Sequence, residues 1–236
     1  MKFETKTLEF LKGEKFSNGL DIKVAERENS ITDRITFLKG KVEGKSIIHV
    51  GFTDHVPLIQ QKINKNIWLH KILSDVAEKC IGIDIDYDAV EFVKNNYGFG
   101  DLFVHDLTGD TILEEITKQK WDYMIIGEVL EHIDNPVNFL NTVKEKYGNW
   151  VERIIITVPN AFDLINIRKL RHNIEFINTD HRYWFTPFTL AKVCTRAGFD
   201  IESFHYCNSF APVKWLPRFL LKRFPVLREG IIMVIV

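Results

Sequence analysis

Short apolar runs alternate with segments of helical spacing from residue 45 onward, and this alternation most limits how the chain can fold. Runs of buried-strand type occupy residues 46–50, 80–84, 102–104, 122–126, 153–158, 200–206 and 230–236. Helical spacing predicts helices over residues 68–79, 88–96, 136–147 and 186–198. Strands that alternate with helices predict an α/β fold with a doubly wound, mostly parallel sheet. The last two runs have no clear crossover helix between them, so we expect an antiparallel last strand.

Composition narrows the class of protein further. The chain has 236 residues, of which 45% are hydrophobic. This hydrophobic fraction is sufficient for a packed core and argues against a disordered chain. Its formal net charge of −1 disfavours a globally basic nucleic-acid binder. Three widely spaced cysteines form neither a disulfide framework nor a CxxC metal site, which favours a reducing, cytoplasmic setting. The amino terminus has no signal-peptide pattern, and no apolar run approaches the roughly 18 residues of a membrane span.

The pattern divides the chain into an extension and one domain. Residues 1–44 are polar and mixed in charge, and they predict an N-terminal helical extension. Residues 45–236 then form the main domain. Within it, residues 54–67 are rich in Gln, Lys and Asn and predict a loop before the first crossover helix, and residues 208–228 predict a basic, aromatic insert.

Small or acidic residues stand at the ends of four consecutive predicted strands. In open α/β sheets, ligands bind outside the carboxyl ends of the strands. Gly51 permits a sharp turn near a ligand, Asp84 could accept two hydrogen bonds from a ribose diol, and Asp106 could accept one from an adenine amino group. One such aspartate alone is more often a helix cap or turn former. The fourth strand ends at Gly127-Glu128, and four such strand ends in register are harder to explain as caps or turn formers alone.

Six motifs carry a resemblance to a known family: His49-Val-Gly51, Gly82-Ile-Asp84-Ile-Asp86, His105-Asp106-Leu107, Gly127-Glu128-Val-Leu-Glu-His132, Thr157-Val-Pro159-Asn160 and His181-Arg-Tyr-Trp-Phe185-Thr-Pro187. In these motifs, over about residues 45–207, the sequence resembles the class I S-adenosylmethionine-dependent methyltransferases. The resemblance implies a seven-stranded, Rossmann-like methyltransferase fold and S-adenosylmethionine as cofactor. It implies that the cofactor-binding residues are Val50, Gly51, Phe52, Asp84, Ile85, Asp106, Leu107, Gly127 and Glu128. By the same resemblance, Gly51 approaches the methionine part of the cofactor and Glu128 lines the methyl-transfer pocket.

The first turn departs from the family pattern. The family usually has further glycines, whereas this chain reads Gly51-Phe52-Thr53-Asp54, and the stretch from Gly51 to Asp84 is longer than usual. The G-x-G-x-x-G turn of nicotinamide and flavin enzymes is absent, and a turn with one glycine offers little room for a pyrophosphate. A methyl donor is therefore favoured over a dinucleotide.

Glu128, Glu131 and His132 follow the fourth predicted strand at positions i, i+3 and i+4, which share one face if the segment is helical. With His181 they could bind a divalent metal, as in the small-RNA 2′-O-methyltransferases and ubiquinone-pathway O-methyltransferases that this motif resembles. In the alternative no metal is bound, His132 braces the loop and Glu131 is solvated. We favour the alternative without a metal, with His181, Glu128 and His132 as catalytic residues and His181 as general base or substrate contact.

The segment from Ser203 to Arg228 has no acidic residue. Aromatic and aliphatic residues alternate there with the basic residues Lys214, Arg218, Lys222, Arg223 and Arg228. It could lie peripherally on an anionic membrane, contact the phosphates of a nucleotide-linked or lipid-linked substrate, or pack over the sheet edge. Such inserts resemble those of bacterial methyltransferases that act on saccharides and lipid-linked intermediates.

These observations predict O-methylation of a small molecule or of a saccharide or lipid-linked intermediate, with a small-molecule or glycan acceptor as the partner and nucleic acid disfavoured. One alternative is a metal-dependent RNA 2′-O-methyltransferase. Another is a non-catalytic cofactor-binding or interaction module. The sequence carries no indication of the oligomeric state.

Overall fold

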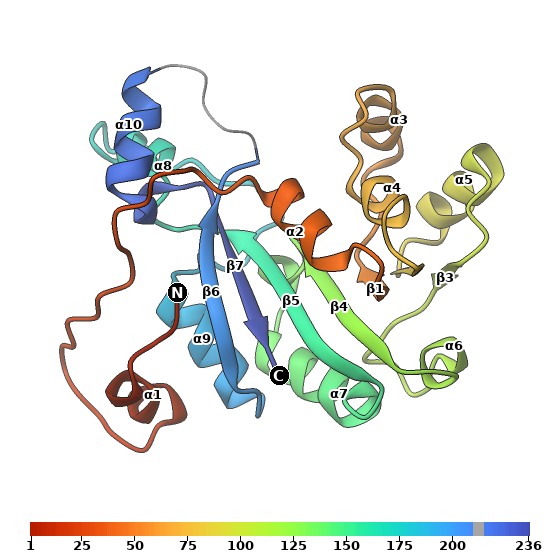
Figure 1. Ribbon diagram of the computed structural model, residues 1–236, viewed down its shortest axis with the longest axis horizontal. Coiled ribbons are helices and arrows are strands. Elements are labelled where there is room, and N and C mark those ends of the chain that lie inside the picture. Colours follow the sequence, from red (N-terminus) through yellow and green to blue (C-terminus); the bar gives the residue numbers. More distant parts are fainter. Residues whose placement is uncertain (210–214) are drawn as a thin grey trace. The chain divides into compact units, whose positions relative to one another are not determined.

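The computed structural model describes residues 1–209 and 215–236, which contain a seven-stranded sheet in the order β3-β2-β1-β4-β5-β7-β6 (Figure 1). The strands are β1 (Ser46–Val50), β2 (Lys79–Asp84), β3 (Leu102–Val104), β4 (Trp121–Gly127), β5 (Val151–Pro159), β6 (Ile201–Cys207) and β7 (Gly230–Ile235). β1 pairs in parallel with β2 and β4, β2 pairs in parallel with β3, and β7 is antiparallel to β6. The predicted mostly parallel sheet with an antiparallel last strand is confirmed.

The helices follow the strands as the alternation predicts. They are α1 (Thr5–Lys12), α2 (Arg34–Val42), α3 (Val56–Asn64), α4 (Leu69–Ser74), α5 (Tyr87–Tyr97), α6 (Glu114–Thr117), α7 (Pro136–Tyr147), α8 (Leu164–Leu170), α9 (Pro187–Arg196) and α10 (Trp215–Arg223), with 3-10 turns η1 (Leu130–His132) and η2 (Pro225–Leu227). α1 and α2 lie within the predicted N-terminal extension. The chain separates into two compact units, which we call unit 1 (residues 1–34, 130–141 and 156–236) and unit 2 (residues 35–129 and 142–155).

Unit 2 contains β1 to β4 and an aromatic core beneath the turn after β1. Phe52, Trp68 and His70 are almost fully buried, and the Phe52 and His70 rings lie 4.7 Å apart. Nδ1 of His49 lies 3.2 Å from Nδ1 of His70, so one imidazole donates a hydrogen bond to the other. A Cβ on Gly82 would lie 2.9 Å from both Phe52 and His70, which explains glycine in the middle of β2.

Three local predictions in unit 2 were wrong. Residues 54–67 are not a loop, because α3 forms there with Pro57 in its first turn and with an ion pair of 2.6 Å between Lys62 and Asp54. The helix predicted over residues 68–79 ends at Ser74, because the backbone of Glu78 already bonds to Lys45 ahead of β1. The helix predicted over residues 88–96 begins earlier, at Tyr87, because the Asp86 carboxylate caps α5 by accepting the backbone N–H of Ala89.

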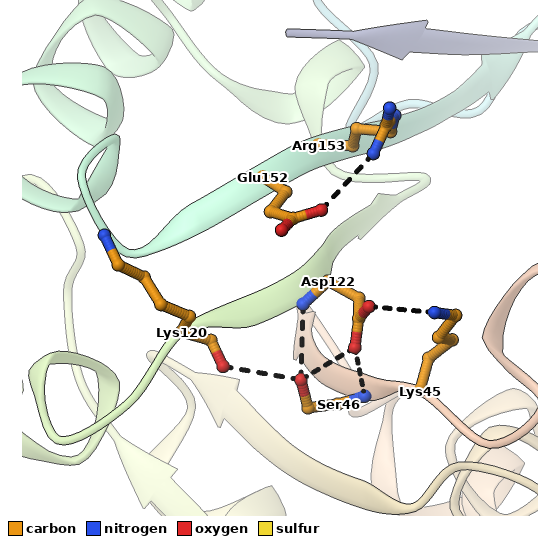
Figure 2. Close-up of polar contacts among 6 residues, drawn as sticks. All are labelled: Lys45, Ser46, Lys120, Asp122, Glu152 and Arg153. Carbon is orange, nitrogen blue, oxygen red and sulfur yellow. Dashed lines mark hydrogen bonds and ion pairs between the residues drawn. The ribbon is translucent and has the colours of Figure 1, made fainter.

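Side chains at the amino ends of β1 and β4 hold these strands in register (Figure 2). The Asp122 carboxylate accepts the backbone N–H and the hydroxyl of Ser46 at 2.9 and 3.0 Å, and it pairs with Lys45 at 3.1 Å. The Ser46 hydroxyl also lies within 3.4 Å of the Lys120 carbonyl oxygen. This network lies at the opposite end of the strands from Gly51 and Gly127, and it leaves the carboxyl ends for a ligand.

Unit 1 contains the antiparallel β6–β7 pair, α1 and α9 (Figure 1). α9 begins with a capping box of Thr186 and Thr189, and its Thr195 hydroxyl donates to the Leu11 carbonyl of α1 at 2.9 Å. Arg228 is fully buried and pairs with Glu28 at 2.8 Å, so among the basic residues of the segment it is not one that could contact a membrane or a phosphate. Across residues 1–209 and 215–236, no helix is long and apolar enough to cross a membrane.

Candidate active site

The turn after β1 is tight, and only glycine fits its first position. Gly51 has a φ of +66°, in the left-handed region, and its N–H donates to the Ile83 carbonyl at 2.9 Å. A Cβ on Gly51 would stand 2.2 Å from Cγ2 of Val129 in the turn after β4. Val50 and Phe52 on either side are buried, so these two residues can offer a ligand mainly their backbone groups.

Asp84, at the end of β2, connects its own strand end to the β1 turn. Its Oδ2 accepts the Thr53 backbone N–H at 3.1 Å and the Thr53 hydroxyl at 2.7 Å, and its Oδ1 accepts the Asp86 N–H at 3.0 Å. A carboxylate has about four acceptor positions, so it can still accept a ribose hydroxyl, or two if the Thr53 hydroxyl rotates away. Next to it the Ile85 side chain is 74% exposed, which makes it an apolar surface at the predicted nucleoside site.

The loop after β3 is held by α7. The His105 Nε2 lies 3.1 Å from the Tyr147 hydroxyl, which also accepts the N–H of Leu113 at 3.2 Å. Asp106 accepts the hydroxyl and N–H of Thr108 at 2.7 and 2.8 Å, and these bonds lower the pKa of its carboxyl group. Asp106 therefore forms a turn and is ionised at neutral pH, while the Leu107 side chain is buried.

Glu128 follows Gly127 at the end of β4 with a φ of +56°. A left-handed backbone at a residue other than glycine costs about 1–2 kcal/mol. Such strain persists only where the surrounding structure enforces it, and it is concentrated at functional sites. The observation supports a functional role for this turn, but the individual contacts predicted for Gly127 and Glu128 stay predictions.

A carboxylate and two imidazoles meet in unit 1. One ligand atom each of Glu131, His132 and His181 lies within 4.8 Å of the others. Glu131 is fully buried, its Oε1 lies 3.9 Å from Nε2 of His181, and the two imidazole rings are 4.7 Å apart and nearly perpendicular. We call these three residues the Glu–His–His cluster.

Contacts made by Arg182 and Tyr183 hold the cluster together. The Arg182 N–H donates to the Glu131 carbonyl at 2.8 Å, and its guanidinium contacts the His132 carbonyl and Asp134. The Tyr183 hydroxyl donates to the Asp134 carbonyl at 2.7 Å. These contacts of Arg182 and Tyr183 hold the segment that carries His181 against η1 and Asp134.

Comparison with known proteins assigns the family. A family model described as a methyltransferase domain matches residues 64–203, more than half of the chain. The chain belongs to this methyltransferase family. It is an S-adenosylmethionine-dependent methyltransferase domain, and S-adenosylmethionine is its cofactor. A comparison with curated protein sequences found no match.

Solved structures with the same fold are distant in sequence. The small RNA methyltransferase HEN1 has a TM-score of 0.53 and 14% identity, with 92% of this chain but 27% of that chain covered. A SAM-dependent methyltransferase from Archaeoglobus fulgidus has a TM-score of 0.50 and 14% identity, covering 86% and 90%. Magnesium protoporphyrin IX methyltransferase from Synechocystis PCC 6803 with bound SAH has a TM-score of 0.50 and 16% identity, covering 85% and 78%. At these identities the likeness shows the fold.

Two expectations about the Glu-x-x-Glu-His segment of the methyltransferase were wrong. Glu128, Glu131 and His132 do not share a face of an α-helix, because the left-handed Glu128 interrupts the chain and η1 starts only at Leu130. Glu131 is buried and not solvated. The reason is tertiary, since residues 181–183 cover η1, and sequence spacing carries no signal of that contact.

The donor set of the Glu–His–His cluster fits a divalent transition metal. Imidazole nitrogens suit such ions, and one carboxylate with two imidazoles is a known ligand set with open positions. Glu131, His132 and His181 would hold the ion, which would supply a Lewis acid for the acceptor oxygen. The same arrangement also serves a metal-free site, in which a buried carboxylate stands beside an imidazole that accepts a proton.

Proposed function

We propose that the methyltransferase transfers the methyl group of S-adenosylmethionine to an oxygen of a small molecule or of a saccharide or lipid-linked intermediate. When bound, the donor supplies a methyl group on a positively charged sulfur. The acceptor O–H bond breaks, an O–CH₃ bond forms, the S–CH₃ bond breaks and one proton is released. The side chains of the chain must therefore bind the donor, orient the acceptor and take the proton.

The observation that carries this proposal is His181 beside the buried Glu131 carboxylate. We infer that the His181 imidazole takes the acceptor proton. The carboxylate 3.9 Å away stabilises the imidazolium that forms, because opposite charges interact strongly where water is excluded. A preformed base supports a hydroxyl acceptor, since a hydroxyl must lose its proton as it becomes an ether.

We infer that the donor is held by the strand ends of unit 2. Asp84 would accept the ribose hydroxyls, Asp106 with the buried Leu107 would border the adenine, and the backbone at Gly51 would approach the methionine part. Exposed Ile85 next to Asp84 supports this assignment, because an aliphatic side chain can lie against the face of a base.

The test measures donor binding and transfer separately. Calorimetry with S-adenosylmethionine should show one site per chain, and radiolabelled donor should then transfer its methyl group to at least one alcohol in a panel of phenols, saccharides and a small RNA. His181→Ala should slow transfer by about 10²–10⁴-fold and spare donor affinity. An His181→Ala variant with the parent's turnover would refute the proposed base.

A metal-dependent RNA 2′-O-methyltransferase is the second candidate, and the convergence of Glu131, His132 and His181 favours it. The two candidates differ in their metal requirement. Excess chelator should leave the first activity intact and stop the second, and added Mn²⁺ or Mg²⁺ should restore the second. Transfer to RNA that disappears with chelator would establish the RNA candidate over our proposal.

We further propose that α10 attaches the methyltransferase peripherally to an anionic membrane. Arg218, Phe219, Arg223 and Phe224 are exposed on or just after this helix, while Leu221 is buried and anchors it. Basic and aromatic side chains together match the interface of anionic lipids. Phe210 and Lys214 of the predicted insert lie outside the described residues.

Sedimentation with vesicles tests this attachment. The parent should bind vesicles containing anionic phospholipid and not vesicles of neutral phospholipid alone. Arg218→Glu with Arg223→Glu should abolish binding, because each basic residue near the surface contributes about 1 kcal/mol. Lys118→Glu, a charge reversal at an exposed residue of unit 2, is the control and should bind like the parent. Equal binding of both variants would contradict the proposal.

A further inference from the structure

A small pocket lies beside α8 in unit 1, with a volume of about 340 Å³. Its apolar lining consists of Ala161, Leu170, Ile174, Phe176 and Trp184, and its polar lining consists of Asn166 and Glu175. Sites for small ligands start at about 300 Å³ and are lined mainly by apolar and aromatic side chains with a few polar groups. In volume and lining, this pocket fits a ligand of one or two rings.

The segment around the pocket is unusually apolar on its surface. Seven large apolar side chains between residues 162 and 183 are exposed: Phe162, Ile165, Leu170, Ile174, Phe176, Ile177 and Tyr183. Isolated exposed apolar residues are ordinary, but a contiguous group marks a surface that contacts something apolar. Three of these seven, Leu170, Ile174 and Phe176, line the pocket.

Both ends of this segment are fixed. Buried Asn160 donates to the carbonyls of Val226 and Arg228 at 2.8 and 2.6 Å, and Ala161 donates to the Phe185 carbonyl at 2.8 Å. At the other end Tyr183 donates to Asp134. Because hydrogen bonds to backbone carbonyls hold its ends, the segment is supported by the fold of unit 1 and is not a free loop.

The pocket is continuous along the chain with the Glu–His–His cluster. Trp184 lines the pocket, and His181 stands three residues before it. Three residues of extended chain span at most about 10 Å. The Cα atoms of His181 and Trp184 are therefore at most about 10 Å apart, and we take this proximity as the link between the pocket and the proposed base.

We propose that this pocket binds the apolar body of the methyl acceptor, and that the acceptor is a ring-containing alcohol or phenol rather than a free saccharide. This inference rests on the proposed function. A saccharide presents hydroxyls on all sides, and each hydroxyl buried without a partner is costly. Two polar side chains cannot satisfy them, whereas five apolar side chains favour an aromatic or alicyclic body.

The probe for the experiment is 1-naphthol, with methyl α-glucoside as the comparison acceptor. Calorimetry should show that 1-naphthol binds the methyltransferase, and Ile174→Ser and Phe176→Ser should each weaken this binding by roughly five- to tenfold. Ile177→Ser is the matched control, because Ile177 is exposed in the same segment but does not line the pocket. Radiolabelled donor should methylate 1-naphthol and not the glucoside.

Two results would overturn the inference. One is 1-naphthol affinity that Ile174→Ser and Phe176→Ser leave unchanged, or that Ile177→Ser reduces equally. The other is methylation of the glucoside without methylation of 1-naphthol. Donor affinity, measured in the absence of 1-naphthol, should be the same in all variants. A parent that fails to bind S-adenosylmethionine would instead refute the proposed function, so the two failures are distinguishable.

Discussion

Removing the Asp84 carboxylate should weaken donor binding markedly. Asp84→Ala deletes the carboxylate that we propose as acceptor of the ribose hydroxyls, and hydrogen bonds to a charged group contribute about 1.5–3 kcal/mol. This corresponds to a roughly 10- to 150-fold increase in the dissociation constant of S-adenosylmethionine. The same change also removes the acceptor for the Thr53 N–H and hydroxyl, so it should lower the free energy of unfolding by about 1–3 kcal/mol.

Thr53→Val separates these two effects. It removes the hydroxyl that bonds to Asp84 at 2.7 Å and leaves the carboxylate in place. We expect it to lower the free energy of unfolding by about 0.5–1.5 kcal/mol and to change donor affinity little. Calorimetric titration well below the unfolding temperature of each variant gives the affinities, and denaturant unfolding gives the stabilities.

The outcome that would refute this reasoning is specific. If Asp84→Ala binds the donor as tightly as the parent, the carboxylate serves only to connect the ends of β1 and β2, and the donor lies elsewhere. If Thr53→Val and Asp84→Ala weaken binding equally, the turn and not the carboxylate sets the affinity.

Three further predictions concern the turn, the cluster and the core of unit 2. Gly51→Ala should lower the free energy of unfolding by at least about 1–2 kcal/mol because of the left-handed backbone alone. Adding Val129→Ala to this variant should recover only the loss of stability that comes from steric overlap with Val129. Denaturant unfolding measures both effects. Glu131→Gln should lower kcat and leave donor affinity unchanged; a silent variant would show that the buried carboxylate plays no part in turnover. Burial and the neighbouring His49 hold the pKa of His70 well below its usual value. The unfolded chain therefore binds more protons below about pH 6.5, and stability should fall by up to about 1.4 kcal/mol per pH unit as the pH drops further, a dependence absent from His70→Phe.

The sheet could be predicted from sequence because its signal is local. β1 and β3 were predicted with their observed bounds, since each is a compact apolar run bounded by polar residues or glycine. α3 was missed because its Gln- and Lys-rich surface hides the buried Ile59 that faces the aromatic core. The amino-acid composition of α3 reflects mainly its exposed residues, whereas its packing against the core depends on the buried Ile59.

The positions of some candidate site residues could be predicted from the sequence, again because the signal that locates them is local. Positions at strand ends follow from the order of the elements, so the amino-acid pattern alone singles out Gly51, Asp84 and Asp106. The burial of Glu131 has no such local signal, because it depends on a segment fifty residues away that covers η1. The pocket beside α8 has no periodic signature either, since its lining comes from a helix, the residues after it and Trp184.

The single glycine of the first turn has a physical explanation in the packing around it. Phe52 is buried against Trp68 and His70, and the Thr53 N–H bonds to Asp84. These contacts fix the backbone after Gly51, a task for which additional glycines would be poorly suited because they raise the entropy lost on folding. The space beside Gly51 is occupied by Val129, so the turns after β1 and β4 touch. A turn held in this way on three sides gains rigidity, and it can present backbone groups to a ligand at little further cost in entropy.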